Sequence, residues 1–403
     1  MALKVDFQHR CKRRSDCGDL LLMNQILTVA IFVALATCVA IVLRYSQTRL
    51  EGDDPQILST FMAILFTSGL DVGLVMFPLT EFPVYEAEAE YGFTNPLAIE
   101  FGFWGFLIWA FYFLTTFYFC IVEPKLKLFE LGPIRWINNL TIIATCAFTG
   151  FLFLSYLPTY IDGISEIARY ILVALVVLIA VCSSTDIRYV KWLSVGSTAL
   201  FFALIALVWW VSGLSLKALV ATAGNLSGYF ANLPKFIAPL TDYHAFYLFW
   251  WFAWSIMIGQ FVARFVGGWR VWHLLIALLV IPSLSIALWF SVLFFVHSEG
   301  IVLSSQIRLA MVTVGVIFVI NSLDSLTRLY SENLNLTVDR LGKGRYITTH
   351  WFLLFGLILL YQLTPLKIEW IGLVVIGLYG CIYTLVFRRR ADWLSPKFDR
   401  TIA

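Results

Sequence analysis

Long runs of apolar residues, joined by short polar connections, dominate the sequence pattern. Each run continues for about 20 residues, which is the length that an α-helix needs to cross the hydrocarbon core of a bilayer. A transmembrane barrel is excluded, because its strands alternate apolar and polar residues over about 10 positions. The pattern predicts eleven membrane spans, at 24–44, 57–80, 97–121, 136–158, 164–184, 190–212, 244–266, 273–297, 305–326, 346–363 and 368–388.

One further segment, 214–235, is less apolar than these runs and carries two glycines, two asparagines and lysines at both ends. We interpret it as an amphipathic helix at the membrane surface. The composition agrees with a membrane protein: 60% of the 403 residues are hydrophobic and 13% are charged, against about 25% charged in soluble domains. We therefore predict an all-α polytopic membrane protein in contact with the lipid bilayer.

The positive charges gather in alternate loops, which orients the chain because cytoplasmic loops are enriched in Lys and Arg. These loops lie near 44–49, 125–135, 188–191, 264–270 and 328–345, and the tail 389–403 is basic as well. The C-terminus is then cytoplasmic, and eleven spans place the basic N-terminal tail 1–23 outside, against its own charge. The net charge of +3 is spread along the chain, so we expect no nucleic-acid partner.

Tryptophan and tyrosine residues cluster on two of the predicted helices. Trp250 and Trp254 lie one helical turn apart, with Trp251 beside them. On the third span Trp104 and two further aromatic residues fall within an arc of about 140°. Membrane tryptophans often form an interfacial belt, but those of 250–254 run toward the middle of their span. The alternative is an aromatic box for a quaternary ammonium cation, which is held by ring faces at about 0.5–2 kcal/mol per ring.

Several segments resemble the betaine/choline/carnitine transporter family, in order and with similar spacing over roughly 44–388. They are 249–264 (FWWFAWSIMIGQFVAR), 282–292 (PSLSIALWFSV), 67–77 (TSGLDVGLVMF), 104–112 (WGFLIWAFY) and 320–325 (INSLDS). The resemblance implies an inverted repeat of five plus five helices, of the LeuT type. Family members usually have two helices before the repeats, whereas this chain has room for one accessory helix.

The resemblance divides the chain into six parts. They are the basic tail 1–23, the accessory helix 24–44, the first five-helix repeat 57–212, the surface helix 214–235, the second repeat 244–388 and the cytoplasmic tail 389–403. Family members are often trimers with the surface helix at the contact. We expect a homotrimer here, or membership of a larger membrane complex.

The family's substrate site would consist of aromatic residues on two facing helices. The matching positions are Trp250, Trp251, Trp254 and Phe246 on the seventh span, and Trp104, Trp109 and Tyr112 on the third. Asp71 lies inside the glycine stretch, where a carboxylate is costly and is a functional candidate. Three interpretations stay open: it neutralises a substrate cation such as choline, it binds a coupling proton, or it pairs with a buried cation for structure.

The resemblance also implies two Na⁺ sites. The first combines backbone carbonyls of the glycine stretch, where the helix unwinds, with side chains of the ninth span. Asn321 replaces the usual threonine of that span. The residues of this site are Gly69, Leu70, Phe318, Asn321 and Ser322. The second uses the hydroxyls of Thr145 and Thr149, with Met257 where an aromatic residue is typical. The alternative for the two threonines is a hydrogen bond back to their own helix.

These features predict a secondary active transporter, not an enzyme. It would carry a trimethylammonium-type solute of the choline, betaine or carnitine class by alternating access, without a cofactor and coupled to Na⁺ or H⁺. The alternative is a transport-inactive structural subunit of a larger membrane complex. We expect Glu81, Asp324, Arg264 and Arg270 to form structural or gating pairs. The expected location is a bacterial plasma membrane, with an organelle inner membrane as the alternative.

Overall fold

The computed structural model of the chain describes residues 14–70, 72–186 and 188–390. Ten helices in this part of the chain are long and apolar enough to cross a membrane. An all-α polytopic architecture is therefore confirmed. The long helices are α2 (Arg14–Tyr45), α6 (Pro96–Trp104) with α7 (Phe106–Phe117), α9 (Gly132–Tyr160), α10 (Glu166–Ser183), α11 (Arg188–Val211), α14 (Asp242–Ala263), α15 (Val271–Ser298), α16 (Ser305–Asn333), α18 (Lys343–Leu363) and α19 (Ile368–Arg388).

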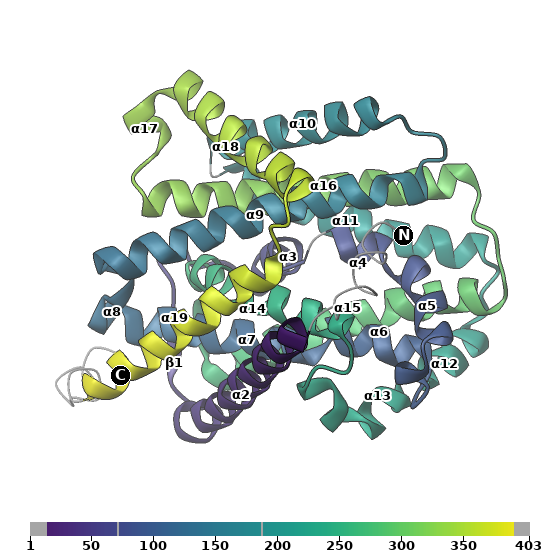
Figure 1. The fold of residues 1–403 in the computed structure, drawn as a ribbon, viewed down its shortest axis with the longest axis horizontal. Coiled ribbons are helices and arrows are strands. Elements are labelled where there is room, and N and C mark those ends of the chain that lie inside the picture. Colours follow the sequence, from purple (N-terminus) through teal and green to yellow (C-terminus); the bar gives the residue numbers. More distant parts are fainter. Residues whose placement is uncertain (1–13, 71, 187, 391–403) are drawn as a thin grey trace.

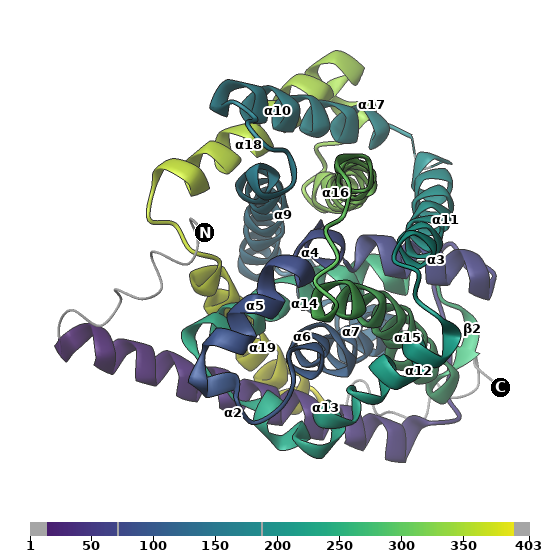
Figure 2. The same cartoon turned by 90° about the vertical axis from the view of Figure 1, so that its right-hand side faces the viewer.

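The helices form two packed groups (Figures 1 and 2). In one group α9 and α16 lie side by side, and α10 and α18 pack across them. In the other, α14 lies between α7 and α19, and α15 packs against α7. The accessory helix α2 packs on α7 and α19 at the periphery. Because α14 is surrounded by other helices, nearly all of its residues are buried, and this places its tryptophans in the centre of the molecule.

The predicted span 57–80 is an interrupted helix, which is why ten long helices replace the eleven predicted spans. It consists of α3 (Leu58–Ser68), α4 (Val72–Met76) and α5 (Pro78–Ala87). Glycine disfavours a helix and proline removes a backbone donor, so Gly69 after α3 and Pro78 at the start of α5 account for the two breaks. Asp71, the acidic candidate in this stretch, lies outside the described residues.

The predicted span 97–121 is interrupted as well. α6 ends at Trp104, and Gly105 adopts a non-helical conformation (φ −84°, ψ −147°) before α7 begins. A Cβ atom on Gly105 would lie 2.7 Å from the backbone oxygen of Phe101, so glycine is required here. After α7 the chain makes the π-helical turn η2 (Tyr118–Val122), then α8 (Glu123–Leu126) and η3 (Leu128–Glu130). The aromatic residues before and after Gly105 therefore do not share one straight helix face.

The remaining short elements lie in the connections. The segment predicted as one surface helix forms α12 (Leu216–Gly224), α13 (Ser227–Ala231) and η4 (Leu233–Ile237), with breaks beside two asparagines. η1 (Ala89–Tyr91) precedes α6, and α17 (Val338–Leu341) precedes α18. β1 (Arg49–Glu51) and β2 (Gly267–Arg270) form an antiparallel ribbon that ties the end of α2 to the α14–α15 loop. The sequence pattern does not predict this ribbon, because strands this short carry no periodic signal.

Candidate functional site

Five buried aromatic rings, from Phe77, Trp104, Tyr247, Trp250 and Trp251, meet between α6, α14 and the start of α5; we call them the aromatic cluster. The rings of Trp250 and Trp251 stack with centroids 4.6 Å apart. Trp104 meets them edge-on, at 4.9 Å from Trp251 and 5.8 Å from Trp250. Tyr247 and Phe77 contact Trp104 at 5.9 and 6.1 Å. Three of the predicted substrate residues are thus brought together, with Tyr247 of the same helix α14 and with Phe77 at the start of α5.

Hydrogen bonding within the aromatic cluster is incomplete. The indole N–H of Trp251 donates to the backbone oxygen of Phe103 at 2.7 Å and so joins α14 to α6. The indole nitrogens of Trp104 and Trp250 are buried without a well-formed hydrogen bond. An aromatic N–H normally finds a partner when buried, and the Trp104 side chain lies close to the buried carboxyl of Glu100. Phe246, predicted to lie near the site, contacts the Trp250 ring at 5.8 Å.

The other predicted substrate residues are placed differently. Trp109 and Tyr112 follow the break at Gly105, and their side chains approach Gly69 at the end of α3. The Tyr112 hydroxyl donates to the Gly69 backbone oxygen at 3.0 Å. Trp254 is buried one turn beyond Trp250, and its indole N–H has no hydrogen-bond partner. The break at Gly105 therefore separates the predicted residues of the third span. Trp104 joins the aromatic cluster, whereas Trp109 and Tyr112 lie against the end of α3.

The interrupted helix exposes backbone carbonyl groups that its own turns cannot pair, and side chains of other helices satisfy them. This is the condition under which irregular backbone is tolerated at membrane depth. The donors come from α7, α9, α15 and α16, which surround the break. The pairs are Tyr112 with Gly69, Ser322 with Thr67 and Leu70, Trp289 with Leu74, and Tyr160 with Met76.

The first predicted Na⁺ site falls at this break. The Ser322 hydroxyl lies 3.0 Å from the Leu70 backbone oxygen and 3.4 Å from that of Thr67. Thr67 is absent from the predicted set, although the i, i+3 spacing of the two carbonyls at a helix end is the signal that would have indicated it. Asn321 turns away and pairs with Ser194 of α11, with its amide nitrogen 3.4 Å from the hydroxyl.

Two other members of this predicted set have their own contacts. The Phe318 ring packs against Phe66 and Phe201, with centroids 6.2 and 5.7 Å away. The Gly69 carbonyl accepts from Tyr112, as described above. The oxygens that lie together at this break are therefore the Ser322 hydroxyl and the backbone carbonyls of Thr67 and Leu70.

The two threonines of the second predicted Na⁺ site differ from each other. The Thr145 hydroxyl donates to the Thr141 backbone oxygen of its own helix at 2.8 Å. The Thr149 hydroxyl is buried without a hydrogen-bond partner. Met257 is buried on α14. The back-bonding interpretation thus describes Thr145, and Thr149 keeps an oxygen that could bind an ion.

Glu100, in the second turn of α6, is a buried acidic residue that sequence reasoning missed. Its side chain is fully buried, and its Oε2 atom accepts a hydrogen bond from the Tyr85 hydroxyl at 2.6 Å. The carboxyl lies close to the Trp104 side chain one helical turn further on. A single carboxylate inside the apolar run 97–121 was the available signal, since ionisable residues within membrane spans are functional candidates.

The other acidic and basic candidates form pairs. Glu81 accepts a hydrogen bond from the Tyr156 hydroxyl at 3.1 Å, and the Tyr156 ring stacks on Phe77 of the aromatic cluster at 4.0 Å. Arg264 forms an ion pair with Glu332. Arg270 on β2 donates to Gln47 at 2.8 Å.

A buried ion pair within α16 contacts the end of α10. Arg328 lies 3.2 Å from the Asp324 carboxylate, and its Nη2 atom also donates to the backbone oxygens of Ser183 and Asp186. In the α10–α11 loop, the hydrogen bonds from Arg188 lower the pKa of the Asp186 carboxyl to about 2. These contacts hold the loop against α16.

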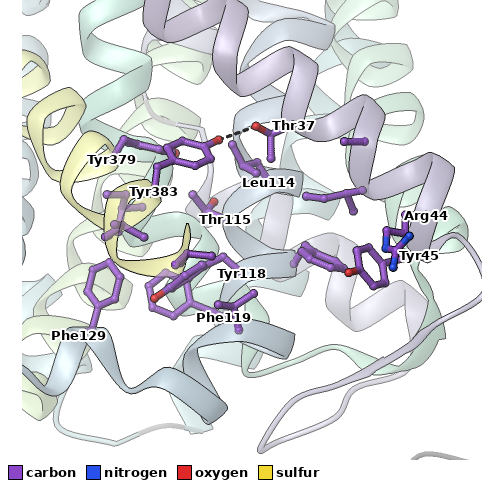
Figure 3. Close-up of a pocket in the computed structure, with 17 residues that line it drawn as sticks. Thr37, Arg44, Tyr45, Leu114, Thr115, Tyr118, Phe119, Phe129, Tyr379 and Tyr383 are labelled. Carbon is purple, nitrogen blue, oxygen red and sulfur yellow. Dashed lines mark hydrogen bonds between the residues drawn. The ribbon is translucent and has the colours of Figure 1, made fainter. Parts of the chain in front are cut away.

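A cavity of about 400 Å³ lies elsewhere, between α2, α7 and α19. Figure 3 shows its lining, with Arg44 at one end, Phe129 at the other and a hydrogen bond of 2.9 Å from Tyr383 to Thr37. Its described lining is almost wholly apolar and includes none of the predicted substrate residues. This cavity therefore does not coincide with the predicted substrate residues.

Comparison with known proteins bears on the family that the sequence resembles. A model of the betaine/carnitine/choline transporter family matches residues 143–296. An uncharacterized transporter of Mycobacterium tuberculosis is 25% identical over 304 residues, which cover 62% of this chain and 50% of that protein. The glycine betaine transporter OpuD of Bacillus subtilis is 25% identical over 281 residues, covering 58% of this chain and 54% of that protein. The predicted resemblance is confirmed, and the family is one of transporters, not enzymes.

Two further similarities concern coverage and fold. The high-affinity choline transport protein of Escherichia coli is 25% identical over 311 residues, covering 66% of this chain and 46% of that protein. The chain thus spans about half the length of the curated relatives it matches. A solved Na⁺-coupled sialic acid symporter aligns with a TM-score of 0.51 and 14% identity over 88% of this chain and 86% of that one. This likeness concerns the fold alone and confirms the predicted LeuT-type architecture.

Proposed function

We propose, from this resemblance and from the site, that the chain is a secondary active transporter of a small trimethylammonium-type solute. The solute is of the choline, betaine or carnitine class, and a bacterial plasma membrane is the expected location. Matched relatives are named as glycine betaine and choline transporters. The five-helix repeats would comprise 57–212 and 244–388, with the substrate between them as in other inverted-repeat transporters.

The aromatic cluster is the observation that supports this proposal. A quaternary ammonium group cannot donate hydrogen bonds, so ring faces are its natural ligands, at about 0.5–2 kcal/mol per ring. The five rings are fully or almost fully buried. A solute therefore reaches them only after a change of conformation, and alternating access requires such a change.

We propose Na⁺ as the coupling ion and the break after α3 as its site. Ser322 with the carbonyls of Thr67 and Leu70 supplies neutral oxygens from two helices. Carbonyls of an unwound membrane helix are the groups that coordinate Na⁺ in transporters of this architecture. The residues fit such an ion, because the hydroxyl can turn its lone pairs toward the cation once it stops donating. A proton remains the alternative coupling ion.

Uptake of radiolabelled choline and glycine betaine into proteoliposomes tests the proposal. Trp250→Ala removes the ring that stacks on Trp251 and contacts Trp104, so we expect saturable uptake to disappear. Trp210→Ala is the matched control, because the Trp210 side chain is 84% exposed on α11, and uptake should persist.

The outcomes separate the alternatives. Unchanged uptake by Trp250→Ala would rule out the aromatic cluster as the substrate site. A wild-type protein that shows neither uptake nor a ligand-induced rise in unfolding temperature would instead support a structural subunit. Stable co-purification of other protein subunits from detergent would support the structural-subunit alternative further.

A further inference from the structure

Glu100 places a carboxyl group against the aromatic cluster without a basic partner. α6 begins at Pro96 after the cap residue Asn95, whose side chain accepts from the Ala98 N–H at 3.0 Å. Glu100 therefore lies in the second turn, one turn before Trp104, and points into the protein with no exposed surface. Trp104 is the ring that meets both Trp250 and Trp251. The carboxyl thus lies directly behind the rings proposed to hold the solute.

The surroundings of this carboxyl are acidic and aromatic. Tyr85 donates to Oε2, while Oε1 is buried without a well-formed hydrogen bond. None of the ion pairs in the described part of the chain includes Glu100. The charged group that acts on it is another buried acid, Glu81 of α5. A buried carboxyl is stabilised in its ionised form by a compensating cation and otherwise takes up a proton, so a cation brought by a solute would favour the ionised form of Glu100.

We propose that the positive charge of the solute compensates Glu100, and that this residue makes the site selective for solutes with a net positive charge. The proposal rests on the proposed function. Choline carries one positive charge, whereas glycine betaine brings a carboxylate of its own. In a site of low dielectric constant, this second carboxylate would repel Glu100 and Glu81. The expected substrate class is therefore cationic quaternary ammonium alcohols and amines, in preference to zwitterionic betaines.

Equilibrium binding to the purified full-length chain tests this selectivity. Radiolabelled choline is displaced by unlabelled choline or glycine betaine, which gives the ratio of the two affinities. We expect the wild type to favour choline by at least about tenfold, because removing one partner of a buried charge pair costs more than that. Glu100→Gln keeps the shape of the side chain and removes the charge, so it should reduce the ratio by at least about tenfold.

Two companion variants make the result specific. Glu90→Gln removes an exposed acidic side chain of η1 nearby, and the ratio should not change. Glu100→Asp keeps the charge on a shorter side chain, and the preference for choline should survive. Both measurements report a ratio and not an amount of active protein, so partial unfolding does not imitate the effect.

The failures of the two proposals are distinguishable. A wild type that binds glycine betaine as tightly as choline overturns the charge selectivity and leaves the transporter proposal standing. A Glu100→Gln protein that keeps the wild-type ratio overturns it as well. If the wild type binds no quaternary ammonium compound at all, the proposed function itself fails.

Discussion

Replacing Arg328 by methionine should destabilise the protein strongly, although the residue is remote from the aromatic cluster. The Arg328 side chain is almost completely buried on α16, and Nη2 reaches Asp324 at 3.2 Å and the Asp186 backbone oxygen at 3.0 Å. Without it, the Asp324 carboxylate is buried with one remaining hydrogen bond, from the Ser183 hydroxyl at 2.7 Å. The substitution also removes the donor that holds the end of α10.

The magnitude follows from the burial of the carboxylate. Removing one partner of a buried ion pair costs about 3–5 kcal/mol, because an uncompensated charge stays in a poorly polarisable interior. Combining Arg328→Met with Asp324→Asn removes both charges, and replacing a buried pair by neutral groups is often close to neutral. We therefore expect the double variant to recover most of the lost free energy of unfolding. A double-mutant cycle expresses this recovery as a coupling energy between the two residues.

Thermal unfolding of the detergent-purified protein, followed by tryptophan fluorescence, measures these differences. Arg188→Met is the matched control, since Arg188 pairs with Asp186 while its side chain is 82% exposed, and exposed pairs contribute little. Its unfolding temperature should stay close to that of the wild type. The reasoning is refuted if Arg328→Met unfolds like the wild type, or if the double variant is as unstable as the single one.

Two further predictions concern the ion site and the packing of α7 on α14. Ser322→Ala should abolish the rise in unfolding temperature that Na⁺ produces relative to K⁺. The control is Ser291→Ala, which should keep this rise, because Ser291 is a buried serine whose hydroxyl donates to its own helix. An equal Na⁺ effect in both variants would exclude the proposed site. Gly259→Ala would place a Cβ atom 2.0 Å from the Thr115 hydroxyl and should destabilise by about 1–3 kcal/mol through overpacking. Gly377→Ala, with open space around its Cβ position, should leave the unfolding temperature unchanged, and similar values for both glycine variants would contradict the packing argument.

Helix positions could be predicted from the sequence because bilayer thickness sets the length of each apolar run. Most observed ends lie within a few residues of the predicted ones. Two ends differ more: α2 begins at Arg14, before the predicted start at 24, and α16 continues to Asn333 past the predicted end at 326. The extension of α16 arises because its polar last turns are covered by other helices and not by lipid. Hydropathy cannot detect that kind of burial.

The helix breaks limited the prediction of the site. Treating 97–121 as one straight helix placed Trp104, Trp109 and Tyr112 on a common face. The backbone at Gly105 changes the direction of the chain between them, and a lone glycine in an apolar run does not reveal this. Glu100 was missed for a related reason: its importance depends on Tyr85 and Trp104 lying beside it, and the contact with Tyr85 depends on how α5 folds back on α6.

The interrupted helix also explains how ion and solute could act on each other. Ser322 donates to Leu70, so an ion bound by these oxygens must displace that hydrogen bond. The neighbouring carbonyl, that of Gly69, accepts from Tyr112, whose ring meets Trp109 edge-on at 5.4 Å. A shift of the backbone at Leu70 would therefore also move the neighbouring carbonyl of Gly69, which Tyr112 of α7 contacts. α7 follows directly from α6, which carries Trp104, so we expect ion binding at the break to alter the spacing of the rings that hold the solute.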